Sequence, residues 1–407
     1  MAMTARDPAL ERGGQGVTFA RGFVAGAVAA GVKREGTTRL DVAVIASTAE
    51  HCHAAGVFTT NHVIAAPCVI SRKHLGKGHL RAIVVNSGNA NACTGPQGER
   101  DAVAMATAGA ELLHVDPHDM AVASTGVIGV PLPMDRIAPA IGRIKLSEAG
   151  WDDVSRAIMT TDTRPKVAQR EVVLVDGTVR IGGIAKGAGM IHPNMATLLT
   201  FVTTDAHIDG AALRPMLRSA ADDTFNAISV DGDTSTNDTL LVLANGASGV
   251  RVGAVDGSKF LDALTAVCLD LARAVVADGE GVTKVFEVRL TGAASESDAR
   301  AAARTITTSN LVKTAIHGAD PNWGRILAAA GRSGAKVDAA RATVRIGDVA
   351  VFEKGAPRSF DANAVRALLA KAEITIEVDL GLGDSTARAW GTDLSAEYVR
   401  INADYTT

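Results

Sequence analysis

Hydrophobic and polar positions along the chain predict strands that alternate with helices. Apolar runs at 40–47, 80–88 and 120–129 favour buried strands, because they are short, rich in valine and alanine, and bounded by glycine or polar residues. Residues 259–276 instead place apolar side chains three and four positions apart, which indicates an amphipathic helix. Regular alternation of strands and helices is typical of an α/β protein.

A predicted hairpin leads to the uncharged segment IHPNMATLLTF. Residues 171–184 indicate the hairpin, in which Asp176 and Gly177 supply the positive backbone torsions that a two-residue connection needs. Residues 196–204 alternate loosely and are rich in Thr, Leu, Phe and Val, so they predict a half-buried strand. On pattern alone, Thr197 is an ordinary residue near the start of that strand.

A strand of clean alternation at 284–290 opens a second β-rich region. Ser295 and Asp298 form a capping-box pattern for the helix that follows. A chain of 407 residues is also too long for most single cores. We therefore predict a main α/β lobe (1–283) and a smaller α/β lobe (284–395). No Pro/Ser-rich linker or internal repeat separates them, so we expect the lobes to pack closely.

Composition and charge exclude several classes of function. The formal net charge is −3 with basic and acidic residues well mixed, so the chain lacks the basic surface that binds nucleic acid or an anionic membrane. Aromatic residues make up 3% of the chain, which argues against base-stacking platforms. There is no apolar signal segment and no run near ~18 apolar residues. We expect a soluble, cytoplasmic protein that acts on small polar or charged metabolites.

The sequence predicts no metal site. Its four cysteines show no CxxC spacing and are spread like core residues of a protein in a reducing compartment. Strand geometry could bring together His51, Cys52 and His53, with His62 nearby, but they lack a recognised ligand spacing. The acidic stretch at 231–238 lacks the glycine and the closing glutamate of a calcium loop. We interpret it as a polar turn.

The chain carries none of the common catalytic motifs. GAGMIH at 187–192 lacks the last glycine of a dinucleotide loop, and GGIAKGAG does not fit the phosphate-loop spacing. The chain contains no G-x-S-x-G elbow and no H-E-x-x-H, which disfavours a common serine hydrolase and a zinc protease. What remains is a set of polar, glycine-containing loops at predicted strand ends, where function tends to be placed.

These loops carry a resemblance to a known family. The chain resembles the ornithine acetyltransferase (glutamate N-acetyltransferase) family of arginine biosynthesis in the segments KGAGMIHPNMATLLTFVTTDA, VVNSGNANACTG, ASTGVIG, MTTDT, SVDGDTSTNDT, DGEGVTK, GADPNWGRI and INADYTT. The likeness covers nearly the whole chain, in order. It implies a layered α/β sandwich of the self-processing N-terminal-nucleophile type, with a smaller C-terminal α/β lobe.

The resemblance implies that the chain cuts itself between Ala196 and Thr197, so that Thr197 becomes an N-terminal nucleophile. A threonine hydroxyl is a weak nucleophile, but a free α-amine on the same residue, with an ordinary pKa of about 8, can take its proton. Cleavage therefore creates the catalytic base without a histidine. His192 and Pro193 precede this bond and are candidates for shaping its loop.

The other site residues are also assigned by resemblance. Thr125 and Gly126 would form an oxyanion hole, with a hydroxyl and a backbone N–H directed at the developing negative charge. Substrate binding is assigned to Thr163, Lys186, Thr197, Glu280, Asn402 and Thr407. We expect Lys186 against a carboxylate and Glu280 against an ammonium, and which substrate group each contacts stays open.

The resemblance further implies that residues 396–407 form a tail that returns to the active site. A tail that reaches a pocket needs anchoring, so we expect Tyr398, Val399 and Ile401 to pack against the main body.

The implied activity is a ping-pong acetyl transfer from N2-acetyl-L-ornithine to L-glutamate through an acetylated Thr197. No cofactor or metal is required. Whether acetyl-coenzyme A also serves as a donor, which would make the enzyme bifunctional, stays open. The two cleavage fragments are expected to remain together, as a heterotetramer of two alpha and two beta chains.

Two alternatives remain. A self-processed N-terminal-nucleophile aminopeptidase or amidase would keep the same nucleophile and use water as the acceptor. An amino-acid binding protein would use the MATLL segment as a plain strand, and its chain would stay intact.

Overall fold

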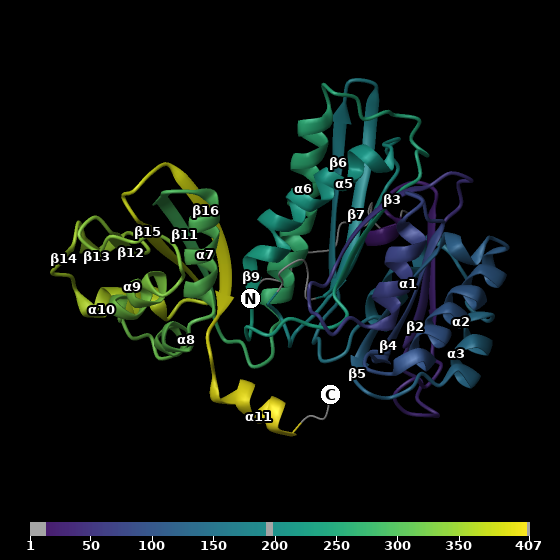
Figure 1. The fold of residues 1–407 in the computed structure, drawn as a ribbon, viewed down its shortest axis with the longest axis horizontal. Helices are drawn as coiled ribbons and strands as arrows, with labels where there is room; N and C mark the ends of the chain where they lie inside the picture. The colour runs from purple at the N-terminus through teal and green to yellow at the C-terminus, as the bar shows by residue number, and fades with distance from the viewer. Residues whose placement is uncertain (1–13, 193–197, 405–407) are drawn as a thin grey trace.

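Two β-sheets lie face to face in the larger part of the molecule, and helices cover their outer faces (Figure 1). A computed structural model describes residues 14–192 and 198–404 of the chain. The first sheet has the order β1-β2-β4-β5, with strands Phe23–Val28, Val42–Ser47, Ala82–Asn89 and Met120–Val127. The second has the order β3-β10-β8-β7-β6, with strands His53–Phe58, Thr239–Ala244, Leu199–Thr204, Gly177–Lys186 and Lys166–Leu174.

Helices on the two outer faces complete a four-layer sandwich. The first sheet is covered by α1 (Ala66–Leu75), α2 (Gly95–Leu113) and α3 (Met134–Ile141). The second is covered by α5 (Gly210–Asp223) and α6 (Gly257–Val276). Helix α4 (Trp151–Ala157) packs beside the core between the sheets. Short 3-10 helices lie at Gly16–Thr18, Pro117–Asp119, Glu148–Gly150 and Phe225–Ala227.

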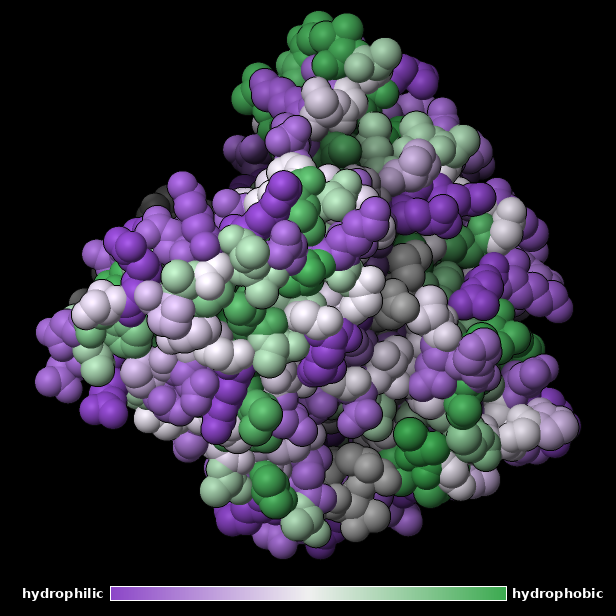
Figure 2. Space-filling model, turned by 60° about the vertical axis from the view of Figure 1, so that its left-hand side comes forward, coloured by the Kyte–Doolittle hydropathy of each residue, from purple (hydrophilic) through white to green (hydrophobic). Residues whose placement is uncertain are grey.

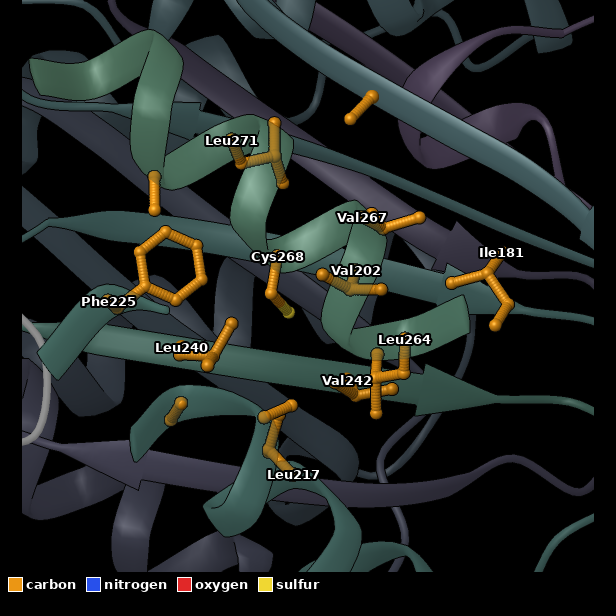
Figure 3. Packing of buried hydrophobic residues seen from close by; sticks show 14 of the residues in the cluster. Ile181, Val202, Leu217, Phe225, Leu240, Val242, Leu264, Val267, Cys268 and Leu271 are labelled. Atoms are coloured by element: carbon orange, nitrogen blue, oxygen red, sulfur yellow. The ribbon is translucent and has the colours of Figure 1, made fainter. Parts of the chain in front are cut away.

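The central strands β8 and β10 of the second sheet bury side chains on both faces, because each face has a layer against it. In β10, Leu240 and Val242 pack toward α5 and α6, while Leu241 and Leu243 pack toward the first sheet. Figure 3 shows the outer of these cores, where side chains of α6 such as Leu264 lie over β10 and β8. This two-sided burial explains why β10 is a nearly continuous apolar run.

A third sheet forms the core of the smaller lobe. Its order is β14-β13-β12-β15-β11-β16-β9, with strands Ala356–Pro357, Val349–Glu353, Thr343–Ile346, Glu373–Asp379, Val285–Ala293, Ser385–Thr392 and Ile228–Ser229. Its helices are α7 (Glu296–Thr307), α8 (Asn310–His317), α9 (Trp323–Gly331) and α10 (Ala362–Leu369). Because β9 lies between α5 and β10 in the sequence, within the main lobe, its pairing with β16 joins the two lobes. Helix α11 (Ala396–Asp404) follows β16 and runs below both lobes (Figure 1).

The structure confirms the predicted layered α/β sandwich and its smaller C-terminal α/β lobe. The alternation at 284–290 is the first part of β11, where Phe286, Val288 and Leu290 are buried. The Ser295 hydroxyl caps α7 by accepting a hydrogen bond from the Asp298 N–H, as predicted. The lobe boundaries at 283/284 and 395/396 stay predictions.

The predicted hairpin exists, but its connection is placed one residue too late. Leu174 pairs with Gly177, so the two connecting residues are Val175 and Asp176. Gly177 is the first residue of β7 and has the positive φ, at +142°. The Asp-Gly pair therefore identified the hairpin correctly but did not fix which residues of β6 and β7 pair. We attribute this register to packing of the two strands against α6.

The surface carries few large apolar side chains. The most exposed are Val173, Val175 and Val255, at 63%, 73% and 83%. The Val175 N–H donates to the Asp256 side chain, which places the segment next to Val255 near the tip of the β6–β7 hairpin. Figure 2 shows a hydrophobic patch at the top of the molecule. Within the described ranges, no helix combines the length and the apolar character that crossing a membrane requires.

Candidate active site

A cavity of about 150 Å³ lies where strands of both facing sheets end. β5 of the first sheet contributes its last residues, and β7 and β8 of the second sheet contribute their adjacent ends. Loop residues and helix α11 complete the wall. Concave sites between the layers of an α/β protein are common places for small-molecule chemistry.

Five residues assigned from the sequence line this cavity: Thr125, Gly126, Lys186, Glu280 and Asn402. They come from β5, β7, the loop after α6 and the C-terminal helix, so the fold collects them from distant parts of the chain. The proposed cleavage residues Ala196 and Thr197, and the terminal Thr407, lie outside the described residues.

Thr163 is placed differently from the other assigned residues. It is exposed and absent from the cavity lining, and both its N–H and its hydroxyl bond the Asp278 carboxylate. Thr160 and Thr161, from the same TTDT stretch, line the cavity instead. The TTDT stretch therefore borders the cavity, and the assignment of Thr163 to substrate binding stays a prediction.

Gly126 lies where β5 approaches β4 too closely for a side chain. A Cβ atom there would be 2.3 Å from the Gly88 carbonyl carbon and 2.4 Å from the Asn89 nitrogen, and φ is +134°. Strand pairing is irregular at the same point, because Asn89 pairs with both Thr125 and Val127. Irregularities of this kind redirect side chains beside functional sites, and this one lies at the Thr125–Gly126 corner of the cavity.

Lys186 is a buried cation at the end of β7. Its Nζ donates to Thr160 Oγ1 at 2.7 Å and to Thr125 Oγ1 at 3.4 Å, and it lies 3.8 Å from Asp162 Oδ2. Burial lowers the pKa of Lys186, although the Asp162 charge opposes this shift. Burial acts to raise the pKa of Asp162, but Lys186 and Lys166 outweigh it and hold that pKa well below its usual range. Asp162 is therefore an ionised partner beside the cavity.

Glu280 supplies a negative group and is held by the tail. Asn402 Nδ2 donates to Glu280 Oε2 at 2.9 Å. On its other side the carboxylate lies against Gly189, where a Cβ atom would be 2.5 Å from Glu280 Oε2. The Glu280 N–H donates to the Ala188 carbonyl at 3.0 Å. The cavity thus combines the Lys186 ammonium, the acidic side chains of Glu280 and Asp238, and threonine hydroxyls.

Helix α11 is anchored mainly by polar contacts. Ser395 Oγ donates to the Gly281 carbonyl at 2.6 Å and accepts from the Tyr398 N–H at 3.2 Å. Tyr398 and Ile401 are partly buried, and burial raises the pKa of the Tyr398 hydroxyl. Val399 is 61% exposed, so the prediction that it packs against the main body is wrong. A helix that touches the body along one side leaves the residues of its other side in water.

The acidic stretch at 231–238 is a hydrogen-bonded turn, as interpreted from the sequence. The Asp231 carboxylate accepts from the backbone N–H groups of residues 190–191 at 2.6 and 2.8 Å. Asn237 Nδ2 donates to the Ala90 carbonyl at 2.6 Å. Residues 235 to 238 also form one wall of the cavity. The sequence did not predict that this stretch lies at the cavity, because its only local signal was a density of polar residues.

His192 is held by contacts on both ring nitrogens. Nδ1 lies 3.2 Å from Ser229 Oγ, and Nε2 lies 2.9 Å from the guanidinium of Arg304 in α7. The His192 carbonyl accepts from Thr234 Oγ1 at 2.9 Å. Burial and the Arg304 charge lower the pKa of His192 to about 4. The ring is therefore neutral at pH 7, and its Nε2 accepts the bond from Arg304.

Among the residues that the structure describes, no group of three or more His, Cys, Asp or Glu side chains is arranged to hold a metal. Burial raises the pKa of Cys52 to about 12. Since a thiolate is the form that binds metals, Cys52 is poorly suited to the alternative of a His-Cys metal site.

Protein comparisons identify the family. The ArgJ family model matches residues 24–407. The arginine biosynthesis bifunctional protein ArgJ of Symbiobacterium thermophilum is 53% identical over 397 residues, covering 96% of this chain and 98% of the relative. The ArgJ protein of Dehalococcoides mccartyi is 50% identical over 394 residues, covering 96% and 97%.

A solved structure from the same family aligns with part of the chain. The crystal structure of the arginine biosynthesis bifunctional protein argJ from Bacillus halodurans is 44% identical, with a TM-score of 0.49. The alignment covers 50% of this chain and 98% of that chain.

A cavity with opposite charges and hydroxyl groups, set between the layers of an α/β sandwich, is typical of an enzyme site for a small molecule. The chain belongs to the ArgJ family. It is an acyltransferase of arginine biosynthesis.

Proposed function

We propose that the protein is a glutamate N-acetyltransferase that moves the acetyl group of N2-acetyl-L-ornithine to L-glutamate. The observation that carries this proposal is the set of groups around one cavity: the Thr125–Gly126 corner, the Lys186 cation and the Glu280 anion. Ornithine presents a carboxylate and an ammonium, and glutamate presents two carboxylates and an amine. One fixed cation and one fixed anion can therefore orient both substrates.

The proposed nucleophile is Thr197, after self-cleavage of the bond that follows Ala196. Leu198 and Leu199 line the cavity, and Thr197 directly precedes them in the sequence. Cleavage would free an α-amine on the residue that carries the hydroxyl, so base and nucleophile would belong to one residue.

The first half-reaction forms the acetyl-enzyme. Thr197 Oγ attacks the acetyl carbonyl carbon while its α-amine takes the hydroxyl proton. The Thr125 hydroxyl and the Gly126 N–H stabilise the oxyanion. The carbon–nitrogen bond then breaks, the proton passes to the leaving amine, and ornithine departs.

The second half-reaction restores the enzyme. The α-amine of glutamate attacks the acetyl ester of Thr197, and N-acetylglutamate leaves as the hydroxyl regains its proton. No cofactor enters either step. Acetyl-coenzyme A as a second donor would acylate Thr197 in the same way, and an assay with acetyl-coenzyme A and glutamate alone tests that extension.

Substrate contacts and assembly complete the proposal. Lys186 binds a substrate carboxylate and Glu280 an ammonium, while Thr163, Asn402 and Thr407 add hydrogen bonds. The two fragments stay associated in the cytoplasm, and two such pairs form a heterotetramer.

Replacing the proposed nucleophile tests this account. Thr197→Ala should leave one chain of 41.8 kDa with no transferase activity, whereas Thr197→Ser should still be cut and active, because serine keeps the hydroxyl. Denaturing electrophoresis and a glutamate acetylation assay give both readouts. Two fragments from Thr197→Ala would refute the nucleophile. Hydrolysis faster than transfer to glutamate would instead favour the aminopeptidase or amidase alternative.

A further inference from the structure

A second lysine, Lys166, lies behind the cavity and is more deeply buried than Lys186. It is the first residue of β6, its relative exposure is 1%, and it is not among the residues that line the cavity. Its Nζ donates to Asp162 Oδ1 and to Asp278 Oδ2, both at 2.6 Å. A buried ammonium is costly unless it is paired and hydrogen-bonded, so two such short contacts indicate a built network.

The two carboxylates of this network, Asp162 and Asp278, each contact a residue assigned to substrate binding. Asp162 stands beside Lys186, whose Nζ is 3.8 Å from Oδ2. Asp278 accepts from the Thr163 N–H at 3.0 Å and from the Thr163 hydroxyl. Lys166 therefore links Thr163, outside the cavity lining, to Lys186 inside it.

The contacts of Asp162 explain why Lys186 is not drawn into a tight ion pair. Asp162 Oδ1 accepts from Lys166 Nζ and also from the Gly187 N–H at 2.6 Å, and Oδ2 accepts from the Thr160 N–H at 3.0 Å. A carboxylate that is already neutralised and hydrogen-bonded attracts a second ammonium less strongly. Lys186 instead donates to hydroxyl groups at the cavity, Thr160 Oγ1 at 2.7 Å and Thr125 Oγ1 at 3.4 Å.

We infer that Lys166 is a positioning residue of the acetyl-transfer site, which occupies Asp162 and so keeps the Lys186 ammonium available to a substrate carboxylate. The inference rests on the proposed function. Without Lys166, Asp162 closes on Lys186 and draws Nζ away from the cavity. Lys166 thereby acts through Asp162 and touches no substrate.

The test is a double-mutant cycle between Lys166 and Asp162, read as the KM values of the acetyl-transfer assay. Lys166→Met should raise KM for N-acetylornithine and for glutamate about 10-fold or more, since a displacement of about 1 Å at a positioned group costs up to ~10²-fold. In an Asp162→Asn background, the same Lys166 substitution should change KM by no more than about twofold, because Asp162 has lost the charge that captures Lys186.

Lys313 offers a matched control for loss of a buried ammonium. It is 3% exposed, and its Nζ donates to the Val230 carbonyl, the Thr392 carbonyl and Thr392 Oγ1 at 2.7, 2.6 and 2.8 Å. Lys313→Met should lower the melting temperature while KM stays near the wild-type value. An equal rise of KM in Lys313→Met would show that any buried lysine has the same effect, and would overturn the inference.

The outcomes separate this inference from the proposed function. A wild-type enzyme that is not cut and does not transfer acetyl groups refutes the proposed function. A cut, active wild type with an unchanged KM in Lys166→Met refutes the role of Lys166 alone. If Lys166→Met does not fold, Lys166→Gln replaces it in the same cycle: a rise of KM that disappears in the Asp162→Asn background supports the inference, and an unchanged KM overturns it.

Discussion

Replacing Gly281 with alanine should disconnect the C-terminal helix from the active site. Gly281 has φ at +66°, and a Cβ atom there would be 2.4 Å from the Tyr398 backbone nitrogen and 2.8 Å from its Cα. Non-bonded carbon contacts have their optimum near 3.5–4.0 Å, so α11 must move by about 1 Å or more. The same helix carries Asn402, whose 2.9 Å bond to Glu280 would then exceed hydrogen-bond length.

Gly281→Ala should have two separate effects, a loss of stability and a rise in KM. A non-glycine residue in the left-handed region costs about 1–2 kcal/mol of stability. Displacement of Asn402 removes the only described hydrogen bond that α11 makes to the Glu280 carboxylate. We expect Gly281→Ala to raise KM in the acetyl-transfer assay about 10-fold, because the Glu280 carboxylate, proposed to meet the substrate ammonium, is no longer fixed.

Gly249 provides the control for backbone strain. Its φ is +74°, but a Cβ atom there meets nothing within 4 Å. Gly249→Ala should therefore lose a similar amount of stability, measured by thermal unfolding, and keep the wild-type KM. Equal KM values for Gly281→Ala and Gly249→Ala would refute the idea that the tail positions Glu280.

Two predictions concern His192. Its pKa falls from an ordinary 6.5 to about 4 in the folded chain, so the unfolded chain binds the proton more readily and stability is lost as pH drops from about 6.5 toward 4. In urea unfolding, His192→Gln should lose less stability over this range than the wild type, by on the order of 2 kcal/mol, and an equal loss would contradict the assignment. Arg304→Met removes the bond to His192 and should slow self-cleavage about 10-fold, followed by electrophoresis of new precursor. Arg300→Met, one helical turn earlier and bonded to the Asp222 carbonyl, should cleave normally; equal slowing of both would refute a specific role for Arg304.

Apolar periodicity predicted most of the large elements. The spacing at 259–276 corresponds to α6, which begins at Gly257 and ends at Val276. The alternation at 284–290 corresponds to β11. Both signals arise because one face of each element is buried, which leaves a period in the sequence. The exposure of Val399 could not be read in this way, since a short helix with mixed residues has no dominant apolar face.

The charged network behind the cavity was missed for a different physical reason. Lysine and aspartate are mostly exposed, so a sequence alone places Lys166, Asp162 and Asp278 on the surface. Lys166 and Asp278 are 112 residues apart in the sequence, and no local spacing records their contact. Resemblance to a family located Lys186 and Thr163, whereas the groups that hold these residues appear only after the chain is folded.

The fold also explains how a cut chain could keep one active site. Strand β8 begins at Leu199 and pairs with β7 on one side and with β10 on the other. Its pairing with β7 runs from Lys186↔Leu199 to Ile181↔Thr204. Under the proposed cleavage, β7 would belong to the first fragment, and β8 and β10 to the second. Separating the fragments would open this sheet and expose core residues of β8 such as Phe201, which is fully buried. Since Lys186 and Glu280 would also come from different fragments, association is a requirement for activity as well as for stability.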